Sequence, residues 1–176
     1  MGFHDKLTTR KGALGEQIAR RHLESRGLIV YAPLTDGAHL FDFLCANKQK
    51  QSIVAAEVKT KPRRLYFPDT GVDIRHYRDY MAVQSKYGVD VFLYFVDEHE
   101  RRIYGNKLTV LIASREVEHN GRRLCYPLQS GGIIYFPLCA MVDVAVLSEE
   151  DATEISALST RSGGYEYTTG GSGEVV

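Results

Sequence analysis

Two acidic side chains and a lysine occur between residues 41 and 59 in a pattern suited to phosphate chemistry. Asp42 lies between two phenylalanines, and Glu57 and Lys59 follow, two residues apart. Successive side chains of a β-strand point to opposite faces, so Glu57 and Lys59 share one face while Val58 points the other way into a core. If the strand that carries Asp42 pairs with this one, two carboxylates and an ammonium converge on one small surface.

Such a cluster is suited to a hard cation. Proteins usually bind Mg²⁺ with one or two carboxylates, completed by water and substrate phosphates, and Mn²⁺ suits similar oxygen ligands. As an alternative, Glu57 and Lys59 form only a surface ion pair, worth at most about 1 kcal/mol. Asp42 is harder to explain in this way, because aspartate is depleted in strands and costly to bury unpaired. The pattern therefore indicates metal-assisted phosphodiester cleavage.

The elements that must position these residues are predicted from periodicity and from capping residues. The first helix ends before Gly27, and the polar stretch from Asn47 to Gln51 predicts a hairpin. The N-terminal elements are expected to be a helix at 9–26 and strands at 28–33, 39–46 and 52–60.

A basic and aromatic loop is expected at 61–73, followed by a second helix at 74–87 that Asp73 caps and Gly88 ends. A glutamine, Gln84, interrupts the apolar stripe of this helix, and it either serves the site or satisfies a hydrogen bond in the core. The stripe expected to face inward comprises Ile74, Tyr77, Met81 and Gln84.

The remaining chain predicts mostly strands. Residues 89–96 are apolar on both faces, as in a central strand with both sides covered, and Asn120-Gly121 is typical of a two-residue hairpin turn. Further strands are expected at 102–105, 108–113 and 131–138, and a short helix after Ser148. This order predicts an α/β (α+β) fold, with a mixed sheet flanked by helices. We expect a single domain over residues 1–158 and a flexible tail over 159–176, which is rich in Gly, Ser and Thr.

Composition limits the broad class of protein. With 44% hydrophobic and 25% charged residues, the 176-residue chain is typical of a soluble globular domain. No apolar run approaches the roughly 18 residues of a membrane span, and the first residues lack the apolar stretch of a signal peptide. Three widely spaced cysteines form no CxxC pair. We therefore expect a cytoplasmic location and no membrane association.

The formal net charge is zero, but the charges are distributed unevenly. Residues 1–64 contain 12 Lys and Arg against 6 Asp and Glu, and the remainder contains 10 against 16. A basic half that carries the candidate site suits a partner with a phosphate backbone. DNA is the expected partner, and RNA is not excluded because the chemistry needs no 2′-hydroxyl. A solvated basic surface is the alternative explanation of the asymmetry.

The set Gly15-Glu16, Asp42, Glu57-Val58-Lys59 and a following helix with Gln84 resembles the PD-(D/E)XK nuclease superfamily, in particular its Holliday junction resolvase-like branch. The resemblance spans about residues 10–105 and implies a restriction-endonuclease-like core. It implies Mg²⁺ or Mn²⁺ as cofactor and hydrolysis of DNA, with branched or recombination and repair intermediates as a substrate class.

Residue by residue, the resemblance implies that Asp42, Glu57 and the Val58 carbonyl bind the metal, with Glu16 holding a second metal or its water. Lys59 would position the attacking water or stabilise charge on the phosphate, and Gln84 would lie nearby. On the residues alone, Glu16 could instead pair with Arg20, four residues on.

Nucleic-acid contacts are expected from the loop after the site and from the first helix, because cations contact phosphates and aromatic rings stack on bases. A second hypothesis is a non-catalytic nucleic-acid-binding or interaction module on the same scaffold. Junction cleavage would need two sites and hence a homodimer, for which segment 131–147 is either an interface or core. The expected contact residues are Lys61, Arg63, Arg64, Tyr66, Arg10, Lys11 and Arg20.

Overall fold

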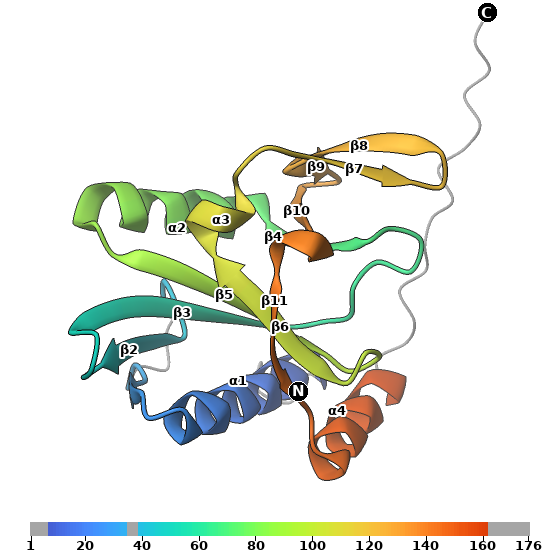
Figure 1. Ribbon diagram of the computed structural model, residues 1–176. Coiled ribbons are helices and arrows are strands. Elements are labelled where there is room, and N and C mark those ends of the chain that lie inside the picture. The colour runs from blue at the N-terminus through green and yellow to red at the C-terminus, as the bar shows by residue number, and fades with distance from the viewer. Residues whose placement is uncertain (1–6, 35–38, 162–176) are drawn as a thin grey trace, which may run out of the picture.

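A six-stranded mixed sheet forms the centre of the computed structural model, which describes residues 7–34 and 39–161 (Figure 1). Its β3 and β5 pair in parallel, and its other neighbouring strands are antiparallel. The spatial order is β1-β2-β3-β5-β6-β11. The strands are β1 (Ile29–Tyr31), β2 (Phe43–Asn47), β3 (Ser52–Thr60), β5 (Asp90–Asp97), β6 (Arg102–Lys107) and β11 (Val142–Val146).

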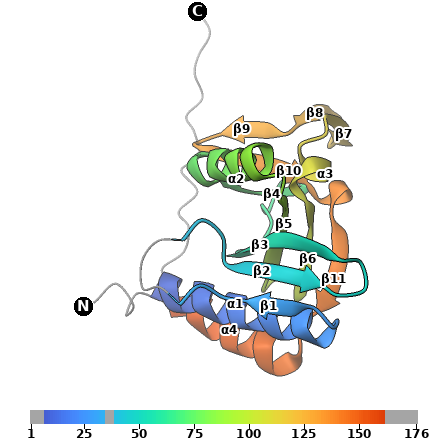
Figure 2. The same ribbon diagram turned by 90° about the vertical axis from the view of Figure 1, so that its left-hand side faces the viewer.

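Helices cover both faces of this sheet, as Figure 2 shows from the side. The helices α1 (Leu7–Ser25) and α4 (Glu149–Arg161) lie on one face. On the other face lie α2 (Ile74–Tyr87), the short α3 (Leu108–Leu111) and two small sheets. The small sheets comprise β4 (Asp69–Asp73), β10 (Ile133–Pro137) and β9 (Leu128–Ser130) in one, and β7 (Arg115–His119) and β8 (Arg122–Tyr126) in the other; a 3₁₀ turn (Leu138–Ala140) precedes β11. The expected mixed sheet flanked by helices is confirmed.

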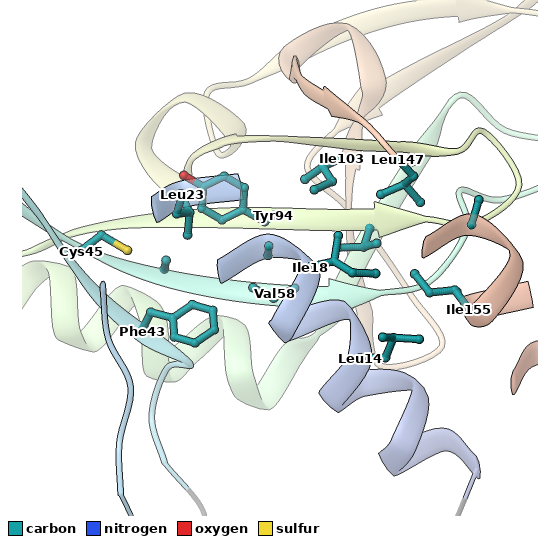
Figure 3. Packing of buried hydrophobic residues seen from close by; sticks show 14 residues of the cluster. Leu14, Ile18, Leu23, Phe43, Cys45, Val58, Tyr94, Ile103, Leu147 and Ile155 are labelled. Atoms are coloured by element: carbon teal, nitrogen blue, oxygen red, sulfur yellow. The ribbon is translucent and has the colours of Figure 1, made fainter. Parts of the chain in front are cut away.

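Two hydrophobic cores follow from the alternation of side chains along the central strands. Ala56 and Val58 of β3 belong to the core beneath the sheet, which lies between the sheet and the helices α1 and α4 and includes buried side chains of both helices (Figure 3). Ala55 belongs to the core on the α2 face. The expected alternation in β3 is therefore present, and it directs Glu57 to the α2 face.

The segment around Asp42 differs from the prediction. The strand begins at Phe43, so Asp42 precedes β2 and does not lie within a strand. Phe41 packs against the core on the α2 face, whereas Phe43 is buried in the core beneath the sheet. The two phenylalanines thus point to opposite faces, because the chain changes direction at Asp42.

Two further predictions were wrong. Residues 69–73 form β4 rather than a loop; at Gly71 a side chain would place its Cβ 2.1 Å from the Ile134 carbonyl oxygen, so this strand pairing requires glycine. Residues 108–111 form a helix rather than a strand. The expected inward stripe of α2 is present in part: Ile74, Tyr77 and Met81 pack against the core, and the more deeply buried Tyr80 and Val83 extend the inward face.

Other predictions were confirmed. Asp73 caps α2 by accepting the Arg75 N–H, and β5 is a central strand between β3 and β6. Turns at 47–51 and at Asn120-Gly121 connect antiparallel strands. Segment 131–147 divides: β10 is part of a core, and β11 is a sheet edge with Val142 and Val146 exposed.

The C-terminal helix reaches Arg161, so it includes the first three residues assigned to the tail, and residues 162–176 lie outside the described part of the chain. No helix among the described residues is both long and apolar enough to cross a membrane.

Candidate active site

The carboxylates of Asp42 and Glu57 are brought together where β2 separates from β3. Phe43 pairs with Ala56, and beyond that point the ladder ends. The Asp42 side chain continues the contact instead, because its Oδ2 accepts the Val58 backbone N–H at 2.7 Å. Asp42 is only 8% exposed. This hydrogen bond fixes the first carboxylate against the strand that carries the second.

Glu57 is 5% exposed and receives two hydrogen bonds on one oxygen. Lys59 Nζ lies 2.5 Å and the Tyr80 hydroxyl 2.6 Å from Glu57 Oε1. Glu57 Oε2 accepts no hydrogen bond from the described residues. Lys59 and Glu57 share a face, as predicted, but Tyr80 of α2 was not expected.

Glu16 approaches the same region from α1 through a close helix–strand contact. A Cβ at Gly15 would lie 1.8 Å from Thr60 Oγ1, so glycine lets the helix lie against the end of β3. The pKa of Glu16 is raised to about 7, first by burial and then by the negative charge of Asp42. The alternative pairing with Arg20 is wrong, since Arg20 bonds Glu24 at 2.9 Å.

Excess negative charge characterises this region. Burial raises the pKa of Glu57, the Lys59 ammonium opposes that shift, and the Asp42 carboxylate adds to it. Three carboxylates, Asp42, Glu57 and Glu16, thus interact with one hydrogen-bonded ammonium and with the His39 ring, whose Nε2 lies 3.4 Å from Asp42 Oδ1. A bound cation would relieve this repulsion, so the donor set fits a divalent metal of the hard, oxygen-preferring kind.

The number of side-chain ligands is small. In residues 7–34 and 39–161, no group of three or more His, Cys, Asp or Glu side chains is arranged to hold a metal ion. Two carboxylates, with the Val58 carbonyl, water and a substrate phosphate, would satisfy Mg²⁺. The assignments of Glu16 and of the Val58 carbonyl as ligands remain predictions.

Gln84 lies on α2 one turn beyond Tyr80, and therefore on the same side of the helix. Its Oε1 is buried, and no group in the described part of the chain donates a hydrogen bond to it. Among the described residues, no hydrogen bond joins the Gln84 side chain to Asp42 or Glu57. The residue that sequence reasoning missed is Tyr80, which its spacing of three from Tyr77 and four from Gln84 could have indicated.

Most of the expected phosphate-binding cations have carboxylate partners within the fold. The Arg63 side chain bonds Glu100, and Arg64 forms a two-pronged pair with the buried Asp69. Lys11 pairs with Glu98, which is buried.

The other expected nucleic-acid contact residues are exposed to solvent or have no ion pair among the described residues. Burial and the neighbouring Lys59 lower the pKa of Lys61 to about 8, and no ion pair holds it among the described residues. Tyr66 is 69% exposed, and Arg10 is also exposed. Lys61, Tyr66 and Arg10 are therefore the members of the predicted set best placed to contact a ligand.

The fold has a counterpart among solved structures. Hjc, a Holliday junction resolvase from the archaeal hyperthermophile Archaeoglobus fulgidus, superposes with a TM-score of 0.52 and 11% sequence identity, over 76% of this chain and 97% of that chain. No protein-family profile matches the sequence, and no curated protein sequence is similar to it. At this identity the likeness establishes a nuclease-like fold.

Proposed function

We propose that the protein is a Mg²⁺- or Mn²⁺-dependent nuclease of the PD-(D/E)XK type that hydrolyses phosphodiester bonds in DNA. The observation that carries this proposal is the Asp42–Glu57 pair, held at the end of β3 beside Lys59. The similarity in fold to a Holliday junction resolvase supports branched DNA as the substrate class. Cleavage of both strands of a junction would require two copies, and hence a homodimer.

Each side chain has a distinct role in this proposal. A divalent cation at Asp42 and Glu57 would polarise the scissile phosphate and lower the pKa of a bound water. Lys59 holds its ammonium beside Glu57, where it would orient the attacking water or stabilise negative charge on the phosphate. In-line attack by that water would leave 5′-phosphate and 3′-hydroxyl ends. Lys61, Tyr66 and Arg10 would contact the DNA outside the reacting phosphate.

Cleavage assays with matched variants test the proposal. Purified protein is incubated with Mn²⁺ and four-way junction, duplex or single-stranded DNA. Asp42→Asn and Lys59→Ala should abolish cleavage, and EDTA should stop it. The control is Lys107→Ala, because this exposed lysine pairs with Asp90 at the other end of β5. Circular dichroism verifies that each variant folds.

Three results would contradict the proposal in different ways. Full cleavage by Asp42→Asn or Lys59→Ala would refute the site, and cleavage in EDTA would refute the metal requirement. DNA binding by the wild type without any cleavage would favour the non-catalytic module.

A further inference from the structure

Tyr80 is a buried residue of α2 whose hydroxyl reaches the candidate site. The side chain is 2% exposed and belongs to the core on the α2 face. Buried tyrosine hydroxyls normally find a hydrogen-bond partner. Here the partner is Glu57 Oε1, at 2.6 Å. Packing therefore fixes the ring, and the ring fixes the position of the hydroxyl at the carboxylate.

Both hydrogen bonds to the Glu57 carboxylate are made to the same oxygen, and this determines how the carboxylate is oriented. The Tyr80 hydroxyl and Lys59 Nζ both donate to Oε1, the first from helix α2 and the second from the strand that carries Glu57. Two donors on one oxygen restrict rotation of the carboxylate group. They also leave Oε2 without a hydrogen bond from the described residues, as an acceptor for a ligand.

Two other buried tyrosines of this protein bond carboxylates, and they show a different arrangement. The Tyr104 hydroxyl donates to Asp97 Oδ2, which also accepts the Arg63 N–H, while Asp97 Oδ1 accepts two more backbone N–H groups. Tyr126 donates to Asp69, whose two oxygens are both bonded by Arg64. Both of those carboxylates are satisfied on both oxygens, whereas Glu57 is satisfied on one.

We propose that Tyr80 is a positioning residue that orients Glu57 so that its second oxygen binds a divalent cation. This inference rests on the proposed function and adds a residue to it. Hydrogen-bond partners of metal ligands fix the ligand geometry, and their removal typically costs 10–100-fold in metal affinity or activity. Tyr80→Phe removes only the hydroxyl and keeps the packed ring.

Calorimetric titration with Mn²⁺, in the absence of DNA, measures the effect directly. Tyr80→Phe should weaken Mn²⁺ binding about tenfold. The matched control is Tyr104→Phe, which loses an equally buried hydroxyl–carboxylate bond elsewhere and should bind Mn²⁺ within about twofold of the wild type. In a Glu57→Gln background, Tyr80→Phe should change Mn²⁺ affinity no further, because the residue acts through Glu57.

Cleavage kinetics provide a second readout. The Mn²⁺ concentration for half-maximal cleavage should rise about tenfold in Tyr80→Phe, and the rate at saturating Mn²⁺ should approach that of the wild type. Equal Mn²⁺ affinity of Tyr80→Phe and wild type would overturn the inference and leave the proposed function intact. Equal losses in Tyr80→Phe and Tyr104→Phe would also overturn it, as a general effect of buried hydroxyls. Failure of the wild type to bind Mn²⁺ would overturn both.

Discussion

Glu57 and Asp69 are two buried carboxylates of this protein that meet the same kinds of donor in different arrangements. Asp69 is fully buried; Arg64 bonds both of its oxygens, and the Tyr126 hydroxyl adds a bond to Oδ2 at 2.6 Å. The Arg64 guanidinium is itself held between the rings of Phe67 and Tyr135. Glu57 also meets a cation and a tyrosine, but both contact a single oxygen.

Asp69 and Arg64 form a structural clamp, in which one guanidinium balances one carboxylate and both carboxylate oxygens accept hydrogen bonds. The surroundings of Glu57 lack this balance. At the candidate site, the carboxylates of Glu57, Asp42 and Glu16 outnumber the Lys59 ammonium and the His39 ring beside Asp42, and one oxygen of Glu57 has no hydrogen bond in the described residues. Buried charges are tolerated when paired or when they coordinate a metal. An unbonded carboxylate oxygen and an excess of negative charge therefore distinguish the region of Glu57, which can bind a cation, from that of Asp69.

The largest expected effect is that of a substitution at Glu57 on DNA cleavage. Glu57→Gln should reduce DNA cleavage about a thousandfold, because metal stabilisation of transition-state charge is worth several kcal/mol and each 1.4 kcal/mol is tenfold in rate. In EDTA at pH 8 the same variant should be no less stable than the wild type, because the fold disfavours the charged form of Glu57. Single-turnover cleavage and urea unfolding measure the two quantities. Unchanged cleavage would place Glu57 with Asp69 as a structural carboxylate.

A substitution at Asp69 should instead lower the stability of the protein. Asp69→Asn leaves Arg64 without its charged partner, and breaking a buried pair costs about 3 kcal/mol. The free energy of unfolding from urea titration should fall by that amount, while Mn²⁺ affinity of the folded protein stays unchanged. A loss below about 1 kcal/mol would show that Asp69 is not a structural clamp.

Two glycines of α1 offer a sharper test of how Glu16 is positioned. Gly15→Ala should destabilise by about 1–3 kcal/mol, because its Cβ overlaps Thr60 at the end of β3. Gly12→Ala meets nothing within 4 Å and should stabilise by up to about 1 kcal/mol through helix propensity. Thermal or urea unfolding of both variants measures the contrast. Equal effects of the two substitutions would mean that α1 does not lie this close to β3.

The smallest expected effect is the pH dependence of stability at Glu16. The fold raises its pKa from 4.5 to about 7, so this contribution to stability is present below pH 4.5 and is lost as pH rises through 7. In EDTA, Glu16→Gln should equal the wild type at pH 4.5 and exceed it by about 1 kcal/mol at pH 8, since Glu16 is partly exposed. Excess Mg²⁺ should reduce the difference. A difference that does not change with pH would contradict the crowding of carboxylates around Glu16.

The sequence predicted that Asp42, Glu57 and Lys59 lie close together, but not the backbone that brings Asp42 there. Period-two alternation in β3 placed Glu57 and Lys59 on one face, because a nine-residue strand with small apolar residues opposite has a clear pattern. The place of Asp42 between two phenylalanines suggested a strand, but the chain bends at Asp42 and the two phenylalanines point to opposite faces of the sheet. At that point the Val58 N–H bonds the Asp42 side chain instead of a backbone carbonyl of the neighbouring strand. The alternation of polar and apolar residues does not reveal such a hydrogen bond.

Contacts between different segments explain the other errors. Pro68, Asp69 and Gly71 are residues typical of turns, and residues 69–73 form a strand because β10 pairs with them. Tyr80 and Arg64 gained their roles from partners 23 and 5 residues away. Arg64 looked like a phosphate contact because its partner, Asp69, lay in the segment taken as a loop.

Crystals soaked in Mn²⁺ show through anomalous scattering whether Asp42 and Glu57 bind a metal ion. We expect a peak within coordination distance of Asp42 and Glu57 Oε2, about 2.2 Å from each ligand oxygen, which disappears in Asp42→Asn crystals. A fully soaked crystal with no peak between these two carboxylates, or with a peak only elsewhere on the protein, would contradict this expectation.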